Sequence, residues 1–291
     1  MTASAEHGSA FFPGFETRRL TVDGVDIHFV VGGSGPPLLL VHGAPQSGIM
    51  WRRIAPELAK RFTLIIPDLR GYGRSGKPAR ADYSKRRMAA DLVAVMDSLG
   101  HDRFFVAGHD RGARVTRRLI KDHQPRIVRG AILDIVPTAY LYANISQQAA
   151  INLWNWCIWP APEPIPETII DPVAQVTMVV HALGGEPDPE AADDYIRTNG
   201  NAESLHAMCE DYRAGATVDL EHDAADAATL IDVPLLIAWG SKSVSTASIF
   251  DVRAGWMGEG SDMHFASIPS GHFMAEELPD ETTALLLDFF G

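Results

Sequence analysis

The stretch FFVAGHDRGARV, residues 104–115, decides the fold of this chain. It begins with an apolar run typical of a strand buried on both faces and continues into a helical pattern. Between the two lies G-x-D-x-G, in which Gly108 and Gly112 flank Asp110. Flanking glycines permit a sharp turn that lifts the central side chain above the sheet, close to backbone N–H groups at the helix start. The stretch therefore predicts a strand–turn–helix unit that presents Asp110 as a nucleophile. The alternative is an aspartate that only caps its helix.

Short apolar runs recur on both sides of this unit, and helical patterns separate most of them. Two runs joined by Asp23 and Gly24 predict a β-hairpin at the start of the fold. Residues 84–99 predict a crossover helix, with Ser84 as its N-cap and Gly100 as its C-terminal stop. The other strands are expected at residues 38–43, 63–69, 104–110, 131–136, 235–240 and 264–269. This alternation predicts an α/β fold with a mainly parallel, eight-stranded sheet.

The alternation of strands and helices breaks between about residues 138 and 213, where prolines, acids and tryptophans interrupt it. Three of the six tryptophans fall within residues 154–159. Such a cluster buries or presents a large aromatic surface, most simply by covering part of the core sheet. We therefore interpret residues 138–213 as an inserted helical cap subdomain, and residues 1–137 and 214–291 as the core.

Composition and charge exclude several classes of protein. A chain of 291 residues, of which 46% are hydrophobic, suffices for one large domain or two small ones. It carries 25 Lys and Arg against 37 Asp and Glu, a net charge of −12. Binding to nucleic acid or to a membrane surface requires excess positive charge, so neither partner is expected. The glycine-rich segments 31–37 and 70–78 match neither the dinucleotide-binding nor the P-loop pattern, and no cofactor or metal is expected.

Cysteine content and the start of the chain bear on its compartment. Only Cys157 and Cys209 occur, which excludes a disulfide framework and leaves a single bridge open. The first residues, MTASAEHGSAFFPGF, contain neither a basic segment nor a long apolar one, and no stretch has the length of a membrane span. We expect a reduced, cytoplasmic setting.

Two further residues complete a catalytic set around Asp110. A carboxylate at this turn is suited to displacing a leaving group from saturated carbon, which forms an alkyl-enzyme ester. Water that breaks the ester needs a general base, and His272 follows the last predicted strand in IPSGHFMAEE. Asp134, near the end of a buried strand, is the candidate acid that orients this histidine. The alternatives are a surface-loop histidine and a structural aspartate.

Arginines beside the nucleophile indicate the charge of the substrate. Arg111 and Arg114 lie on one face of the first helical turns after Asp110. An anion at about 4 Å from an ionised carboxylate is repelled by roughly 4 kcal/mol at an effective dielectric of about 20, which two guanidinium groups offset. We therefore predict an anionic substrate; the alternative is that one arginine pairs with acids of the cap. Arg117 and Arg118 are expected on a solvated or packing face.

The segments GHDRGARV, HGAPQSGIMW, DLRGYGRSGKP, LDIVPT, MCEDYRAGA and SGHF together resemble the fluoroacetate/haloacetate dehalogenases of the α/β-hydrolase superfamily. The resemblance implies an α/β-hydrolase core with a helical cap, and hydrolysis of haloacetates to glycolate and halide. It implies that Asp110 is the nucleophile and that Asp134 and His272 complete the triad. It also implies that Arg111 and Arg114 hold the carboxylate of a small haloacid, and that the protein is a homodimer.

The same resemblance implies a halide pocket built from a His-Trp pair and a tyrosine of the cap. The matching positions are Asn155, Trp156 and Tyr212, so the histidine is absent. Amide, indole and phenol groups all donate hydrogen bonds to a departing anion. Fluoride is the poorest leaving group of the halides and most needs such donors, so our hypothesis is that chloro- and bromoacetate react at least as well as fluoroacetate. The alternative for Trp156 and Tyr212 is aromatic packing between cap and core.

Two other functions remain as alternatives. An epoxide hydrolase also uses an aspartate nucleophile and a histidine, and it would protonate the epoxide oxygen with cap tyrosines. Tyr140, Tyr142, Tyr195 and Tyr212 are available for this. Two arginines beside the nucleophile would, however, be superfluous for a neutral epoxide. A non-catalytic ligand-binding protein of the same fold is the second alternative, and the complete set of nucleophile, base and orienting acid argues against it.

Overall fold

The computed structural model describes residues 10–184 and 188–291. In these residues eight strands form one sheet in the order β1-β2-β4-β3-β5-β6-β7-β8. Only β2 runs antiparallel to its neighbours, and the remaining pairs are parallel. The strands are β1 (Glu16–Val22), β2 (Val25–Gly33), β3 (Pro37–Val41), β4 (Thr63–Pro67), β5 (Phe104–His109), β6 (Ile127–Leu133), β7 (Leu235–Gly240) and β8 (Met263–Ile268). The predicted α/β class with a mainly parallel, eight-stranded sheet is confirmed.

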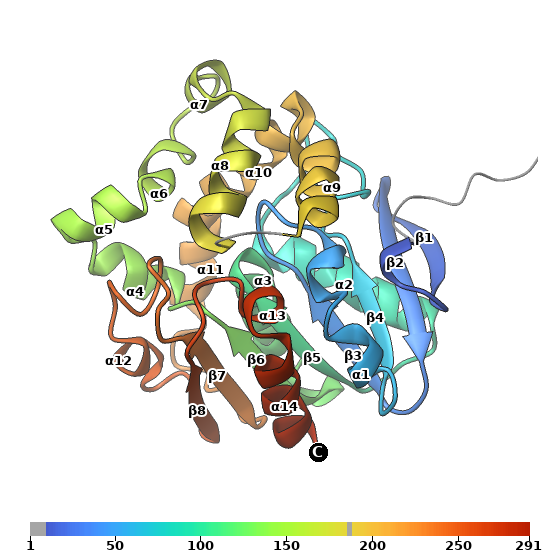
Figure 1. Ribbon diagram of the computed structural model, residues 1–291. Coiled ribbons are helices and arrows are strands. Elements are labelled where there is room, and N and C mark those ends of the chain that lie inside the picture. The colour runs from blue at the N-terminus through green and yellow to red at the C-terminus, as the bar shows by residue number, and fades with distance from the viewer. Residues whose placement is uncertain (1–9, 185–187) are drawn as a thin grey trace, which may run out of the picture.

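Helices connect the strands and cover the sheet (Figure 1). Those of the first half are η2 (Gly48–Trp51), α1 (Ala55–Leu58), α2 (Lys85–Ser98), α3 (Asp110–His123) and η3 (Gln124–Arg126). Between β6 and β7 lie α4 (Thr138–Ala143), α5 (Gln147–Asn152), α6 (Asn155–Ile158), α7 (Ile165–Ile169), α8 (Pro172–Gly184), α9 (Pro189–Asn199), α10 (Ala202–Ala216) and α11 (Val218–Ala225). The last are α12 (Val252–Trp256), α13 (Met274–Glu277) and α14 (Pro279–Phe290).

The central strands are apolar along their whole length because both faces of the sheet are covered. Alternate residues of β3 belong to different clusters: Leu39 and Val41 pack with α2, α3 and α12, whereas Leu38 and Leu40 pack with α1, α13 and α14. Side chains of a strand point alternately to opposite faces, so a strand between two helical layers needs apolar residues at every position. This explains the continuous apolar runs of the sequence.

The predicted local signals are present in the structure. The hairpin turns at Asp23 and Gly24, whose φ values are +50° and +76°. Ser84 caps α2 by accepting a hydrogen bond from the backbone N–H of Arg87 at 3.2 Å, and Gly100 has a φ of +74°. The strand expected at residues 131–136 was placed too late. It starts at Ile127 and ends at Leu133, since the next residue, an aspartate, has a φ of +54° and leaves the extended conformation.

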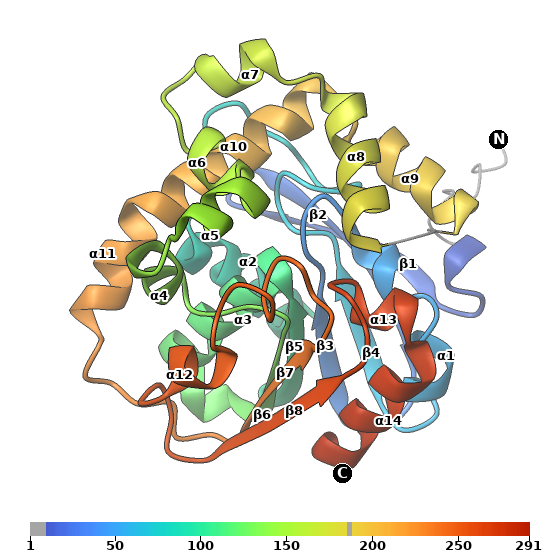
Figure 2. The same ribbon diagram turned by 60° about the vertical axis from the view of Figure 1, so that its left-hand side comes forward.

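The described residues form eight helices between β6 and β7, and α5 to α10 gather over one end of the sheet in both views (Figures 1 and 2). The end of the cap expected at residue 213 falls inside α10, which continues to Ala216 and is followed directly by α11. A boundary at residue 213 would cut α10, which is one continuous helix. Since α11 follows it directly, the helical segment after β6 ends at Ala225. The division into core and cap stays our proposal.

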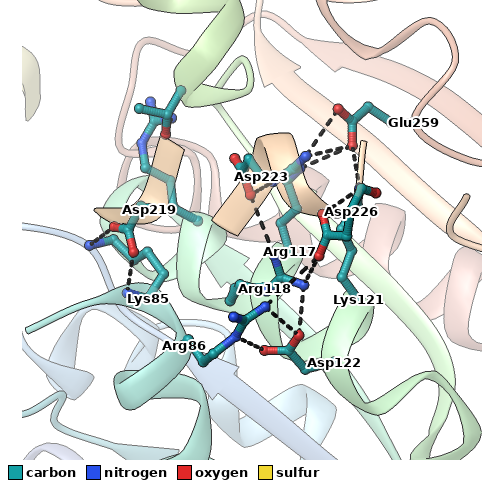
Figure 3. Close-up of polar contacts among 12 residues, drawn as sticks. Lys85, Arg86, Arg117, Arg118, Lys121, Asp122, Asp219, Asp223, Asp226 and Glu259 are labelled. Carbon is teal, nitrogen blue, oxygen red and sulfur yellow. Dashed lines mark hydrogen bonds and ion pairs between the residues drawn. The ribbon is translucent and has the colours of Figure 1, made fainter. Parts of the chain in front are cut away.

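A network of ion pairs joins α3 to α11 and to the loop after α12 (Figure 3). Arg117 bonds Asp223 at 2.7 Å and Glu259 at 2.8 Å, and Arg118 pairs with Asp226. Both arginines are buried. Of the solvated and packing faces expected for Arg117 and Arg118, the structure therefore shows the packing one. Arg118 also bonds Asp122 of the same helix at 2.7 Å, but the other acidic partners come from segments more than a hundred residues later in the chain, which no local pattern of α3 reveals.

Arg117 is expected to be the residue of this network on which stability depends most. Arg117→Met leaves two carboxylates without their main partner, and because these are 14% and 21% exposed we expect a loss of about 2–3 kcal/mol in the free energy of unfolding. The matched control is Arg86→Met, since Arg86 pairs with Asp122 at 3.0 Å but is 44% exposed, and we expect under about 1 kcal/mol. Urea unfolding of both variants measures the difference; equal losses would contradict this assignment.

Two smaller expectations concern cysteines and membranes. Cys157 is exposed, Cys209 is buried and both are free thiols, so the single bridge that the sequence left open is not formed. Within residues 10–184 and 188–291, no helix combines the length and the apolar character that crossing a membrane requires.

Candidate active site

The turn between β5 and α3 places Asp110 at the carboxyl end of the sheet. Asp110 has a φ of +48°, which is rare for a residue with a side chain. A Cβ at Gly108 would collide with the Thr116 hydroxyl, and one at Gly112 would collide with the backbone oxygen of His42. The two glycines are therefore required because the start of α3 packs directly against β5 and the end of β3.

The side chain of Asp110 does not cap its helix. The residue before it, His109, occupies the N-cap position, and no side-chain capping bond is formed there. Instead, the Asp110 Oδ2 atom accepts a hydrogen bond from the backbone N–H of Ala44 at 3.0 Å. This N–H lies in the loop after β3. The capping alternative is excluded, and the carboxylate is held by a backbone donor of a neighbouring strand's loop.

The structure brings the three residues of the predicted triad together. His272 Nδ1 lies 2.6 Å from Asp134 Oδ2, and His272 Nε2 lies 4.0 Å from Asp110 Oδ1. Asp134 is fully buried and also accepts hydrogen bonds from the backbone N–H of Gly240 at 2.9 Å and the Ser243 hydroxyl at 2.7 Å. These three donors hold the buried carboxylate in one orientation. The carboxylate therefore fixes both the orientation of the imidazole and the proton on Nδ1.

Neighbouring groups shift the pKa values of Asp110 and His272 in opposite directions. Burial alone would raise the pKa of Asp110, but the charges of His272, His109 and Arg111 outweigh it and lower that pKa below its usual range. Burial alone would lower the pKa of His272, yet the hydrogen bond and charge of Asp134 raise it above the ordinary value of 6.5. The site thus combines a carboxylate that stays ionised with a histidine of increased basicity.

A cavity of about 130 Å³, measured as the space open to the centres of water molecules, adjoins the triad. Asp110, Asp134 and His272 form its floor, and residues of α4, α5, α6, α8 and α10 form much of its remaining wall. These helices thus cover the carboxyl ends of the parallel strands, where loops of α/β sheets commonly bind ligands.

The two arginines after the nucleophile have different surroundings. Arg111 is buried, and its Nε and Nη2 atoms donate to the Asp211 carboxylate at 2.9 and 2.8 Å. Its guanidinium lies 3.9 Å from the ring centre of Tyr212. One arginine therefore pairs with an acid of the predicted cap, which was the alternative interpretation. Among the described residues, Arg111 Nη1 is a buried donor that has no hydrogen-bond partner.

Arg114 lines the cavity and has no acidic partner in residues 10–184 and 188–291. Its Nη1 atom donates to the backbone oxygen of Val136 at 3.0 Å and to the Thr138 hydroxyl at 2.8 Å, both neutral acceptors. Its Nε atom is buried and lacks a partner among the described residues. Burial, together with the positive charge of Arg111, lowers the pKa of Arg114 to about 10. The charge of Asp110 opposes this shift, but a buried cation without an ion-pair partner is costly, and an anion in the cavity would offset that cost.

The predicted halide residues lie together on the wall of the same cavity. Asn155 Nδ2 donates to the Tyr212 hydroxyl at 3.3 Å, which leaves the phenolic hydrogen free for an anion. The rings of Trp156 and Tyr212 are 5.0 Å apart and nearly perpendicular, so aromatic packing between cap residues is also present. Both the packing and the halide interpretation of these residues are compatible with the geometry.

Two residues of this site were not predicted from the sequence: Trp159, a hydrogen-bond donor on the cavity wall, and Asp211, the carboxylate that pairs with Arg111. Trp159 is buried on the cavity wall, and its indole N–H has no hydrogen-bond partner among the described residues. Its place in the tryptophan cluster was the available signal. Asp211 accepts from Tyr72 at 2.7 Å as well as from Arg111, and pairs with Lys85. The only signal for it was its place beside Tyr212.

Comparison with known proteins agrees with this geometry. The family model of the alpha/beta hydrolase fold matches residues 36–156. A fluoroacetate dehalogenase of Burkholderia sp is 39% identical, with 96% of this chain and 94% of the relative covered. A soluble epoxide hydrolase of Corynebacterium sp. (strain C12) is 31% identical, covering 92% and 95%. The crystal structure of ALR0039 from Nostoc sp PCC 7120, described as an alpha/beta hydrolase, is similar with a TM-score of 0.90 and 41% sequence identity. The match covers 96% of this chain and 99% of that one. The chain therefore belongs to the α/β-hydrolase family, as a relative of fluoroacetate dehalogenase, and is a hydrolase.

Proposed function

We propose that the protein hydrolyses haloacetates to glycolate and halide through an ester on Asp110. The observation that carries the proposal is Arg114, a cation that faces the cavity beside the nucleophile and has no ion-pair partner among the described residues. A carboxylate substrate would supply that partner and would place its halogen-bearing carbon near Asp110. The 39% identity to a fluoroacetate dehalogenase supports the same choice.

In the first step the Asp110 carboxylate attacks the carbon that bears the halogen. A carbon–oxygen bond forms as the carbon–halogen bond breaks, and the halide leaves with the bonding electrons. Because Oδ2 accepts the N–H of Ala44, we assign the attack to Oδ1. Tyr212 and Trp156, together with Trp159, line the cavity wall and offer an O–H and indole N–H groups to the departing anion. Asn155 orients the tyrosine hydroxyl.

In the second step water breaks the ester. His272 Nε2 lies 4.0 Å from Asp110 Oδ1, a distance that suits removal of a proton from a water attacking the ester carbonyl carbon. The N–H of Ala44 then stabilises the negative oxygen of the tetrahedral intermediate. Collapse of the intermediate releases glycolate, which takes the proton from His272. The second proton of the water leaves the resulting carboxylic acid for solvent, which restores the Asp110 carboxylate. Asp134 stabilises the transient imidazolium.

The turnover rate is expected to fall with decreasing pH through the pKa of His272. Only neutral imidazole accepts the proton of water, and this pKa lies above 6.5, so activity should already be half lost above pH 6.5. Asp110 does not cause this acidic limb of the pH profile, because its pKa is lowered from 3.8. Asp134→Asn removes the main cause that raises the pKa, so the limb should move to lower pH. A wild-type limb below pH 6.5 that Asp134→Asn leaves unmoved would contradict the assignment.

Halide release from a panel of substrates tests the proposal against its rivals. We expect release from chloro- and bromoacetate at rates equal to or above that from fluoroacetate, and a preference for fluoroacetate would contradict the halide-pocket hypothesis. Styrene oxide tests the epoxide hydrolase alternative: diol formation without halide release from any haloacid would replace our proposal. Binding of haloacetate without turnover of either class would favour the non-catalytic alternative.

A further inference from the structure

The cavity beside Asp110 is larger than a haloacetate requires. One water-sized sphere itself occupies roughly 10–15 Å³, so about 130 Å³ of space for the centres of such spheres is room for on the order of ten water-sized groups or more. A haloacetate consists of two carbons, two oxygens and one halogen. Much of the cavity would remain unfilled around such a substrate.

The unfilled part of the cavity is apolar. Its charged groups are confined to the end at Asp110, Asp134, His272 and Arg114. Elsewhere the wall consists largely of aliphatic and aromatic side chains contributed by the inserted helices and by the loop before α12. Examples are Leu141 of α4, Leu153 at the end of α5, Val179 of α8 and Phe250. Such a wall binds an apolar group better than it binds ordered water.

Three contacts fix how a haloacid would lie. Its carboxylate would pair with Arg114, its halogen would point to the donors of Tyr212, Trp156 and Trp159, and its reacting carbon would contact Asp110, since all of these residues line the cavity. The carbon has one further direction available for a substituent larger than hydrogen. The cavity continues to Met178, which lines it and is 45% exposed, so its wall reaches the surface at α8. A substituent therefore has a path along apolar wall toward solvent.

We propose that the substrates of this site include 2-haloalkanoates that carry an apolar chain on the halogen-bearing carbon, and that such acids are preferred to those with a short chain. The inference rests on the proposed dehalogenation and names its substrate class. Each methylene buried on an apolar wall improves binding roughly three- to fourfold. Because the apolar substituent of the substrate contacts the same wall in the ground and transition states, the improved binding is expected to increase kcat/KM.

The test compares 2-bromopropionate, 2-bromobutyrate and 2-bromohexanoate with bromoacetate as reference. The three longer acids share a secondary reacting carbon, so their intrinsic reactivity is matched and only the chain differs. We expect kcat/KM for bromide release to rise at least tenfold from 2-bromopropionate to 2-bromohexanoate. A decrease along the series, with bromoacetate still hydrolysed, would overturn this inference and leave the proposed function intact. No bromide release from any of the four acids would overturn both.

A pair of variants localises the effect. Leu153→Trp fills part of the apolar wall, and we expect the ratio of kcat/KM for 2-bromohexanoate to that for bromoacetate to fall at least tenfold. The matched control is Ile151→Trp on the same short helix, whose side chain is 62% exposed and outside the cavity, and which should leave both values unchanged. Bromoacetate hydrolysis by each variant reports correct folding. An unchanged ratio in active Leu153→Trp would overturn the placement of the chain.

Discussion

Replacing His272 with glutamine is expected to lower steady-state halide release by about 10⁴-fold or more, yet to leave one rapid release of halide per enzyme molecule. Displacement of the halide needs only the ionised Asp110 and the donors of the cavity. Hydrolysis of the ester needs the base, and no second histidine touches the cavity in the described residues. The variant should therefore stop after a single displacement. Rapid-quench measurement of halide with bromoacetate checks the size of the burst.

Two comparisons make this result specific. Asp110→Asn should give no burst, since the nucleophile is lost. His264→Gln replaces an exposed histidine of β8 that pairs with Asp262 at 3.1 Å, and it should retain the wild-type rate. A folded His272→Gln protein that releases no halide at all, or that turns over at the wild-type rate, would contradict the assignment of His272 to ester hydrolysis.

Replacing Arg114 with glutamine is expected to lower kcat/KM for bromoacetate by roughly 10²–10³-fold, and to change that for bromoacetamide less than about threefold. Bromoacetamide has nearly the same shape and the same leaving group but no negative charge. The contrast follows from the surroundings of Arg114, which bonds two neutral acceptors and has no carboxylate partner among the described residues. Its charge is thus available to an anionic substrate. Initial rates of bromide release measure both values.

The neutral substrate separates recognition from folding. If Arg114 only stabilised the fold, both substrates would lose activity equally in Arg114→Gln. Arg117→Met provides the comparison, because that side chain lies on the same helix but pairs with acids outside the cavity. It should lose stability without changing the ratio between the two substrates. An equal loss for bromoacetate and bromoacetamide in Arg114→Gln would remove the main support for a haloacid substrate.

Local patterns in the sequence were sufficient for much of the fold and for the triad. Gly108 and Gly112 mark a close approach of α3 to β5 and β3 that only glycine permits, and apolar runs mark strands covered on both faces. Asp134 was recognisable because a carboxylate at the end of a buried strand needs partners. The hydroxyl of Ser243 and the N–H of Gly240 supply them together with the histidine.

The remaining features depend on pairs of residues that are distant in the sequence. Nothing near Arg111 shows that Asp211, a hundred residues later, takes its charge, whereas Arg114 is left without an acid in the described residues. In the same way, α3 alone does not decide whether Arg117 is solvated or packed, because its partners lie on α11 and beyond α12. The size and apolar wall of the cavity likewise result from how the inserted helices pack over the sheet.

The central claim is that Asp110 forms an ester which water then breaks. The most direct test is to determine whether the new oxygen of the glycolate comes from the enzyme or from water. A single turnover of bromoacetate is run in water enriched in ¹⁸O with enzyme in excess, followed by mass analysis of the peptide that contains Asp110 and of the glycolate. Attack of water on the ester carbonyl places the label in Asp110, and the glycolate carries an unlabelled oxygen from the enzyme. Label in the glycolate and none in the peptide would show direct attack of water on the substrate carbon and would contradict the mechanism.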